Sequence, residues 1–324
     1  MVVKLRSVSR QTADCWLLID SWLALKSDNT IRQYKSALNA WCRFLVAETY
    51  SPEGAEVLLS ADDRDAYEYL ANFRARPAQP GRSAAVSKTI SKATIAKTVT
   101  ILATIYRELE RSRFIERNPF TASFRDYGKT RKADRRPAQL MPYEAVSKIL
   151  DRPDRSDEGR RDAAFLALLF GGGLRIGEAV SLTLADITFS ETSAIAHLRC
   201  TKSGETASQV IAFGSDKIRE YYDLRVTYDD KLQPFLVSYA YGKPKGDWSI
   251  STAHRTFKRY CRACGLPSFS PHCARATAIT KLLDDGIPHR DVATFSRHSS
   301  VQMVERYDKR RLKISDAIAQ KLKF

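Results

Sequence analysis

Apolar residues in the first third of the chain recur every three or four positions, which is the spacing of one face of an α-helix. Leu18, Trp22 and Leu25 predict a first helix on this basis. Asn29-Thr30 is expected to open a second helix, because short polar residues favour helix N-termini. The apolar face expected for the second helix comprises Tyr34, Leu38, Trp41, Leu45 and Val46.

Two more helices are expected before residue 120. One covers about 61–74, and a Pro-, Gly- and Ser-rich loop over about 75–88 follows it. The next covers about 92–112, and Asn118-Pro119 is expected to close it, because proline cannot continue a helix and restricts the residue before it. The apolar face expected for this last helix comprises Ile95, Val99, Leu102, Ile105 and Tyr106.

A basic segment separates this helical part from the rest of the chain. Residues 129–137 read KTRKADRRP, and five of these nine residues are basic. The segment has no apolar periodicity, so a solvated linker is expected, which is compatible with an ordinary exposed loop. The pattern therefore predicts a helical domain over 1–128, a basic linker over 129–137 and a second domain over 138–324.

The second domain is expected to be mainly helical with a small sheet. Its first helices are predicted over 142–150, 161–170 and 175–182, with the glycine run 171–173 between the last two. Residues 194–200 and 208–213 are predicted to be strands, and the turn-forming residues 202–205 lie between them, which predicts a β-hairpin. From Ser215 onward the pattern is mainly that of helices.

Composition narrows the possible partners. Lys plus Arg is 53 and Asp plus Glu is 37, which gives a net charge of +16. Such an excess attracts polyanions, of which nucleic acid is the commonest, although a basic protein can also simply be soluble. The sequence contains neither an apolar run of about 18 residues nor the apolar region of a secretory signal, so no membrane association is expected. Six cysteines in a chain of this length predict reduced thiols and a cytoplasmic location.

The segment SPHCAR places an imidazole and a guanidinium together. Ser270 is a natural N-cap and Pro271 a natural first helical residue, and Gly286 is expected to end the helix. His272 and Arg275 are three residues apart and therefore share one helical face. Helix N-termini favour anions, so this pair is a candidate anion site, although a histidine and an arginine at this spacing also occur by chance.

A second histidine precedes a tyrosine near the C-terminus. A short helix is predicted over 291–298, ending in Arg297-His298. Ser299 to Gln302 matches a capping box that would start another helix, and this helix would carry Tyr307, nine residues after His298. Taken singly, His298 could be a helix cap and Tyr307 a half-buried aromatic residue.

Three further features complete the candidates. Arg175 follows the glycine run and stands near a helix start; a nucleotide-binding loop is disfavoured there because the Gly-Lys-Ser/Thr ending and the dinucleotide spacing are missing. Lys202 lies at the predicted hairpin turn, where a lysine could reach a groove or be merely solvated. Cys261 and Cys264, with His272 or Cys273, resemble half of a zinc site that has no second close pair, so no metal ligands are assigned.

Together these residues form a metal-free set for phosphodiester chemistry. Guanidinium groups stay protonated and can bind two phosphate oxygens, so they can stabilise the charge of a pentacoordinate transition state. A tyrosine hydroxyl ordinarily has a pKa of about 10, so as a nucleophile it needs a neighbouring base or a cationic field. The leaving alkoxide needs a proton donor, which histidine or lysine can be.

The sequence resembles the tyrosine recombinase family, which includes phage integrases and Xer-type recombinases. GGGLRIGEAVSLTLADI resembles the family's first signature and puts its first catalytic arginine on Arg175. The hairpin lysine falls on Lys202, and PHCAR matches the His-x-x-Arg box at His272 and Arg275. RHSS supplies His298, and VERYDK supplies the nucleophile, Tyr307.

The likeness covers about residues 10–320 and is weaker in the first part. SDNTIRQYKSALNAWCRFL and TIAKTVTILATIYRELERSRFIERNPF resemble the family's helical core-binding domain. Two positions depart from the pattern: Ala276 stands where many members have histidine or another polar residue, and Arg297 stands where glycine is usual. Neither departure removes a catalytic group.

The resemblance implies a two-domain, C-shaped clamp around duplex DNA, mainly α-helical with a small sheet. It implies site-specific recombination through a 3′-phosphotyrosyl intermediate and a Holliday junction, with no cofactor, metal or ATP. A homotetramer on two DNA sites is expected, with a second recombinase or DNA-bending proteins as possible accessories, and with the apolar tail after Tyr307 packed on a neighbouring subunit or on its own domain. The rival functions are a DNA-binding regulator of the same fold that does not cut, and a type IB topoisomerase.

Overall fold

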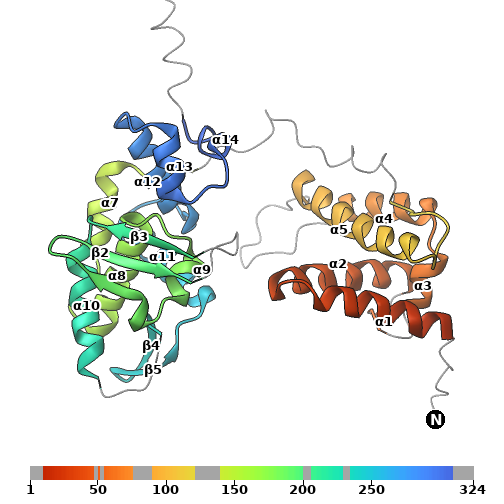
Figure 1. The fold of residues 1–324 in the computed structure, drawn as a ribbon, viewed down its shortest axis with the longest axis horizontal. Coiled ribbons are helices and arrows are strands. Elements are labelled where there is room, and N and C mark those ends of the chain that lie inside the picture. Colours follow the sequence, from red (N-terminus) through yellow and green to blue (C-terminus); the bar gives the residue numbers. More distant parts are fainter. Residues whose placement is uncertain are drawn as a thin grey trace, which may run out of the picture. The chain divides into compact units, whose positions relative to one another are not determined.

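The computed structural model of the protein describes residues 10–46, 50–51, 55–75, 90–120, 139–199, 206–228 and 234–308. The chain divides into two compact units, Met1–Arg136 and Pro137–Phe324 (Figure 1). The basic segment 129–137 lies outside the described residues. No helix within the described ranges is long and apolar enough to cross a membrane.

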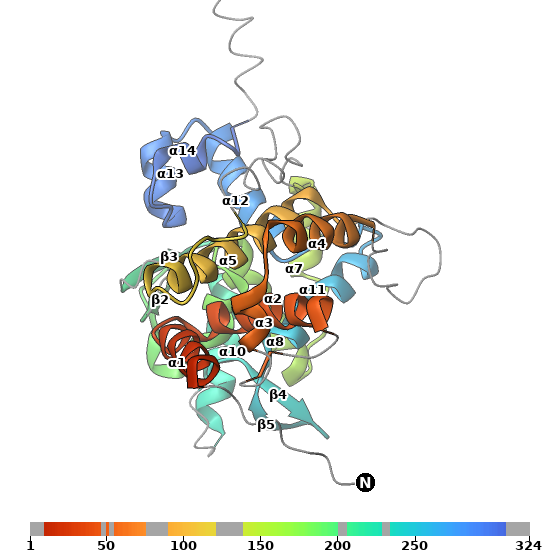
Figure 2. The same cartoon turned by 90° about the vertical axis from the view of Figure 1, so that its right-hand side faces the viewer.

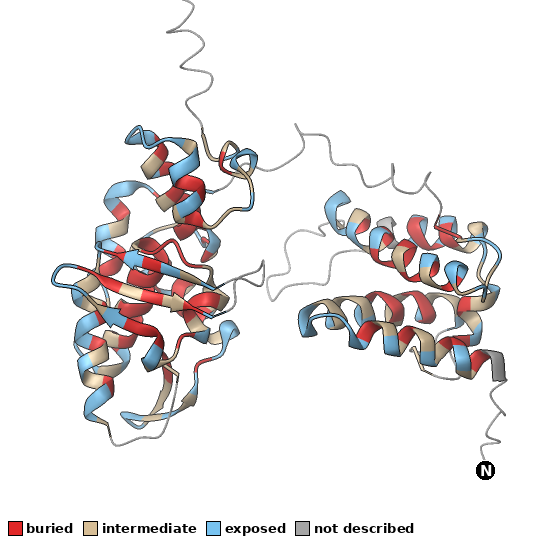
Figure 3. Ribbon diagram, in the orientation of Figure 1, coloured by how far each residue is buried: buried red, intermediate tan, exposed pale blue. Residues whose placement is uncertain are grey.

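Helices are the regular secondary structure of the first unit within its described ranges. Its helices are α1 (Arg10–Ala24), α2 (Asp28–Val46), α3 (Ala55–Ser60), α4 (Asp63–Ala75) and α5 (Lys92–Arg111). Their buried faces meet in one apolar core (Figure 3). Trp41 of α2 lies at its centre, where its indole Nε1 donates a hydrogen bond to the Tyr106 hydroxyl of α5 at 2.7 Å. All five residues of the apolar face predicted for α5 are buried.

Two predictions for this unit, the face of the first helix and the residues that close α5, were wrong, and one helix was not predicted. The buried face of α1 is Cys15, Ile19 and Leu23, whereas Leu25 lies after the helix and is 83% exposed. The three buried residues are spaced by four positions, which keeps them on one face of the helix. The predicted residues Leu18 and Trp22 lie on a neighbouring face. Helix α3 was not predicted. Helix α5 ends at Arg111, because Arg113 adopts a left-handed conformation, and Asn118 instead holds the following turn through its Nδ2 bond to the Ala103 carbonyl at 2.9 Å.

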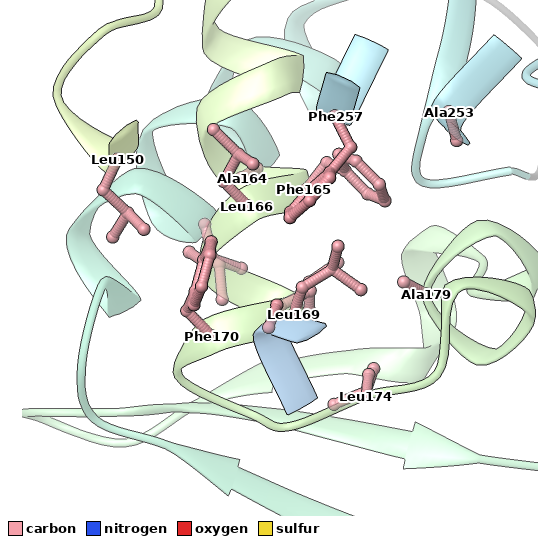
Figure 4. Packing of buried hydrophobic residues seen from close by; sticks show 14 of the residues in the cluster. Leu150, Ala164, Phe165, Leu166, Leu169, Phe170, Leu174, Ala179, Ala253 and Phe257 are labelled. Atoms are coloured by element: carbon pink, nitrogen blue, oxygen red, sulfur yellow. The ribbon is translucent and has the colours of Figure 1, made fainter. Parts of the chain in front are cut away.

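Helix α8 (Asp157–Phe170) is the central helix of the second unit. Every residue from Ala164 to Phe170 is buried, so this segment is enclosed on all sides. The helices packed on α8 are α7 (Tyr143–Leu150), α9 (Ile176–Ser181), α10 (Ser215–Thr227) and α12 (His272–Asp284). Helix α11 (Ile250–Ala263) adds Phe257 and Ala253 to the same core (Figure 4).

A three-stranded antiparallel sheet, in the order β1-β2-β3, belongs to this unit. Its strands are β1 (Ile187–Phe189), β2 (Ala194–Leu198) and β3 (Ala207–Ile211). Ala194 pairs with Ile211 and Leu198 with Ala207, so the predicted pairing of these two segments is confirmed. The predicted turn, 202–205, lies outside the described residues. Burial alternates along β2, as expected for a strand with one face on the core.

A second hairpin was not predicted. Strands β4 (Val237–Ala240) and β5 (Lys243–Asp247) pair antiparallel, and Tyr241 and Gly242 between them both have positive φ. Positive φ at both central residues is the geometry of a tight hairpin turn. The sequence of β5 contains proline and glycine, which disfavour strands, so its composition concealed this element.

Helices α12, α13 (His289–Ser296) and α14 (Val301–Val304) lie together at the end of the described chain (Figures 1 and 2). They share a small apolar cluster that includes Ile279, Val292 and Val304. Two predicted boundaries were wrong by one or two residues: the N-cap of α12 is Pro271 rather than Ser270, and α13 ends at Ser296 before Arg297 and His298. Gly286, at φ +88°, follows the C-cap of α12 as predicted.

Candidate active site

The glycine run places Arg175 at the start of α9. A Cβ on Gly171 would lie 2.1 Å from the Phe213 carbonyl oxygen, and Gly173 has φ +58°, so both positions require glycine. Leu174 and Ala179, on either side of Arg175, belong to the same buried cluster as Leu169 of α8 (Figure 4). The core therefore fixes the turn, while the Arg175 side chain stays 29% exposed.

Glu178 holds Arg175 and also binds a second arginine. The backbone N–H of Arg175 donates to Glu178 Oε2 at 2.8 Å, and Arg175 Nη1 donates to Oε1 at 2.6 Å. Arg297 Nη2 donates to Glu178 Oε2 at 2.9 Å. Burial by itself would raise the pKa of Glu178, but the Arg175 N–H and the charges of Arg297 and Arg175 outweigh it and lower that pKa. Glu178 is therefore a carboxylate at neutral pH.

Arg275 connects the glycine turn to the end of α13. Its side chain is 1% exposed, its Nη1 donates to the Gly173 carbonyl at 2.6 Å, and its Nη2 donates to the Ser296 carbonyl. Burial, followed by the positive charges of Arg175 and Arg297, lowers the pKa of Arg275 to about 10, so it stays protonated at neutral pH. Its Nε is buried without a hydrogen-bond partner among the described residues.

His272 begins α12, on the same helix as Arg275, and its surface is exposed. Loss of solvation, and then the charges of Arg275 and Arg175, lower the pKa of His272. The imidazole therefore lies within the field of both arginines. This juxtaposition agrees with the helical spacing that the sequence predicted.

The hydrogen bonds of Ser296 define the state of His298. The Ser296 hydroxyl donates to the Val292 carbonyl at 2.6 Å, and His298 Nδ1 lies 2.7 Å from Ser296 Oγ. Because that hydroxyl has a single proton, Ser296 Oγ accepts from Nδ1–H, which leaves the lone pair on Nε2. Burial, followed by the charges of Arg275 and Arg175, lowers the pKa of His298 to about 4. His298 is thus a neutral imidazole at neutral pH, with an unprotonated Nε2.

Tyr307 lies next to His298, with ring centroids 5.9 Å apart. The predicted position of Tyr307 on a helix was wrong. Helix α14 begins after Ser300, ends at Val304, and is followed by a turn in which the Tyr307 N–H donates to the Val304 carbonyl at 2.8 Å. The predicted capping box was also wrong, since Ser299 Oγ contacts Met303 Sδ. The apolar cluster around Val304, on which Tyr307 packs, sets this register.

The residue after Tyr307 is tied to another helix. The Asp308 carboxylate lies 2.9 Å from His289 Nε2 at the start of α13, and the Asp308 side chain is 3% exposed. This contact and the buried Val304 hold the turn that carries Tyr307 from both ends. Neither His289 nor Asp308 was selected from the sequence, because the two residues are nineteen positions apart and no local pattern indicates their contact.

The structure thus brings together five of the six residues predicted from the sequence: Arg175, His272, Arg275, His298 and Tyr307. Lys202, the sixth, lies outside the described residues. Sequence reasoning missed Glu178, Ser296 and the contacts of Arg297. Glu178 was detectable by its spacing, since it follows Arg175 by three residues, as the second half of a capping box does.

Among the described residues, no group of three or more His, Cys, Asp or Glu side chains is placed to hold a metal ion, and the thiols considered above for half of a zinc site have the following surroundings. Cys261 and Cys273 are buried, which raises their pKa values to about 11 and about 12. Cys264 Sγ contacts the Lys148 carbonyl at 3.8 Å.

Residues 139–312, more than half of the chain, match the model of the phage integrase family. The chain belongs to that family, which confirms the resemblance drawn from the motifs. It is 24% identical over 287 residues to tyrosine recombinase XerC of Bacillus pumilus, covering 86% of this chain and 85% of that protein. Identity to XerC of Bifidobacterium longum is 31% over 163 residues, 46% of this chain, and the match spans less than half, 43%, of that relative's length.

Solved structures share the fold. The XerH site-specific recombinase bound to a palindromic difH substrate gives a TM-score of 0.66 at 16% identity, covering 99% of this chain and all of that one. A lambda integrase dimer bound to a COC′ core site gives 0.59 at 17% identity, covering 91% of this chain and 77% of that one. The mainly helical fold with small sheets is therefore that of the tyrosine recombinases.

The low pKa of His298 gives a pH prediction. The pKa of His298 is about 4 in the folded protein and about 6.5 in the unfolded chain. Between pH 6.5 and pH 4 this histidine is therefore protonated in the unfolded chain but not in the folded protein. We expect the His298 contribution to stability to be complete above about pH 6.5 and to be lost progressively down to about pH 4. In an NMR titration, the His298 ring, assigned with His298→Gln, should stay neutral down to about pH 5. Protonation near pH 6.5 would contradict this assignment.

Proposed function

We propose that the protein is a site-specific DNA recombinase that cleaves and rejoins DNA strands through Tyr307. The observation that carries this proposal is that Arg175 and Arg275 act electrostatically on each other and on a neutral His298, which lies against Tyr307. Fixed cations and an adjacent base are what a tyrosine needs in order to attack a phosphodiester.

The proposed reaction exchanges one phosphodiester for another. Tyr307 Oη forms a bond to the scissile phosphorus as the bond from phosphorus to the 5′ oxygen breaks. The tyrosine proton passes to a base, the 5′ oxygen leaves with a proton, and the products are a 3′-phosphotyrosyl link and a free 5′-hydroxyl. Because bond energy is conserved in this link, a 5′-hydroxyl can reverse the reaction without ATP.

Each side chain of the site has its own proposed role in this step. Arg175 and Arg275 bind the non-bridging phosphate oxygens and stabilise the charge that develops on them. His298 accepts the Tyr307 proton at Nε2, since its Nδ1 is bonded to Ser296 and the bound phosphate anion offsets the arginine charges that lower its pKa in the free protein. His272 supports the phosphate beside Arg275. Lys202, which the resemblance assigns to the hairpin, protonates the leaving 5′ oxygen.

Double-stranded DNA is the proposed partner. The chain has a net charge of +16, and the related XerH and lambda integrase structures are named as DNA complexes. We propose that the helical core-binding domain, 1–128, and the catalytic domain, 138–324, close around the duplex as a C-shaped clamp. The basic linker, 129–137, would follow the phosphate backbone. A cytoplasmic location fits this role.

The proposed assembly is a homotetramer that pairs two DNA sites and passes through a Holliday junction. An apolar groove of about 500 Å³ between α7, β3 and α12, lined by Phe170, Val210, Phe213 and Phe295 among others, could receive the apolar tail of a neighbouring subunit. Light scattering on two-site DNA tests this assembly. Complexes that never exceed two subunits on one site would contradict it.

A nicked suicide substrate, incubated in EDTA without ATP, tests the proposed chemistry. A covalent protein–DNA adduct is expected, whereas its absence from active, DNA-bound protein would indicate a regulator that does not cut. Two-site DNA then separates the remaining enzymes: recombinant products identify a recombinase. Relaxation of supercoils without recombinants would identify a type IB topoisomerase.

DNA binding should depend steeply on salt, because each neutralised phosphate releases counterions. For about six or more phosphate contacts, affinity should fall about 1000-fold or more between 50 and 200 mM salt. Fluorescence anisotropy with labelled duplex measures this slope. A nearly flat plot of log affinity against log salt would argue against nucleic acid as the partner.

A further inference from the structure

Arg297 has a backbone conformation that ordinary residues avoid. Its φ is 53° and its ψ is 45°, so it lies in the left-handed region at the C-cap of α13. For an L-residue this region is unfavourable, because Cβ approaches the following carbonyl oxygen. A glycine would avoid this cost. The contacts of the arginine side chain must therefore account for its presence at this position.

The Arg297 side chain is directed inward and connects three elements. It is only 9% exposed. Its Nη2 donates to Glu178 Oε2 of α9 at 2.9 Å, and its Nη1 donates to Gln209 Oε1 of β3. It does not behave as a solvated surface arginine. A buried guanidinium is stabilised by its carboxylate partner, and loss of that partner would leave an uncompensated charge.

The contact to Glu178 reaches the site because Glu178 also holds Arg175. Glu178 Oε1 accepts the guanidinium of Arg175, whereas Glu178 Oε2 is shared between the Arg175 N–H and Arg297. If Arg297 were absent, the full charge of this carboxylate would act on Arg175 alone. Arg175 would then be held more tightly by Glu178 and would be less available to an incoming phosphate.

We propose that Arg297 is a positioning residue that acts through Glu178. It neutralises the carboxylate that holds Arg175, so that Arg175 is correctly placed and yet free to bind the scissile phosphate. This inference rests on the proposed strand-cleavage function.

A double-mutant cycle with Glu178 tests the proposal. The rate measured is single-turnover adduct formation on suicide DNA with saturating protein. Arg297→Gly, which removes the guanidinium and relieves the backbone, should lower this rate about tenfold, the coupling expected within one ion-pair network. Arg297→Lys should restore part of the rate. In the Glu178→Gln background, Arg297→Gly should change the rate by less than about twofold, because no carboxylate charge remains to be neutralised.

Arg113→Gly is the matched control. Arg113 is also a left-handed arginine, at φ 59°, but it is exposed and lies in the other unit. Its replacement should relieve the same kind of strain and leave the rate unchanged. Equal rate losses from Arg297→Gly with and without the Glu178→Gln substitution would overturn the proposal, as would an unchanged rate for Arg297→Gly alone. Failure of the proposed function is distinct, because the unmodified chain would then form no adduct.

Discussion

Tyr307→Phe should abolish the covalent adduct on nicked suicide DNA while folding and DNA binding stay almost intact. The substitution removes one oxygen and keeps the ring, which packs on the apolar cluster around Val304 and lies against His298. A phenyl ring has no nucleophilic oxygen, so the first step cannot occur. Gel analysis of the adduct, thermal unfolding and anisotropy measure the three properties separately.

Mass spectrometry of the adducted peptide completes this experiment. In the unmodified protein the phosphodiester should be found on the peptide that contains Tyr307. Tyr143→Phe is a suitable control, since Tyr143 is in the same unit and its hydroxyl donates to Asp284 at 2.5 Å, away from His298. An adduct on another residue, or one that persists in Tyr307→Phe, would show that the nucleophile has been misassigned.

Arg275→Ala should lower the rate of cleavage at least about 100-fold, the size of effect seen when a preorganised oxyanion donor is removed. It should also destabilise the fold by about 2–4 kcal/mol, because the carbonyls of Gly173 and Ser296 lose a buried charged donor. DNA affinity should change far less, since many basic residues share the backbone contacts. Single-turnover cleavage at low temperature and chemical denaturation measure the two losses.

Arg225→Ala separates catalysis from stability. Arg225 is an equally buried arginine, 1% exposed, and donates to the Pro234 carbonyl at 3.3 Å. Its loss should destabilise the fold yet leave cleavage by the folded fraction unchanged. If both variants lose cleavage in proportion to stability, Arg275 has only a structural role. If Arg275→Ala abolishes binding and the residual complexes cut normally, the site has been assigned to the wrong residues.

The local patterns of the chain were sufficient for most of the candidate site. The joint spacing of Arg175, His272, Arg275, His298 and Tyr307 is carried by short motifs, each within one helix or at one helix end. The glycine run before Arg175 could be interpreted from sequence because backbone sterics alone require glycine at Gly173. Local patterns missed the residues that hold the site in place. Glu178, Ser296 and Arg297 do so through hydrogen bonds to residues of other elements.

The sequence by itself determined the helical class, the paired strands of 194–211, the buried stripe of α5 and the order of the candidate site residues, because hydrophobic periodicity and capping chemistry are local. Only the tertiary structure decided that Tyr307 lies in a turn rather than on a helix, since burial of Val304 against α12 and α13 overrides the capping signal at Ser299. The low pKa of His298 and the ion pair between Arg297 and Glu178 likewise depend on the tertiary structure. Burial and charge depend on which elements meet in space, and these contacts join residues far apart in the chain.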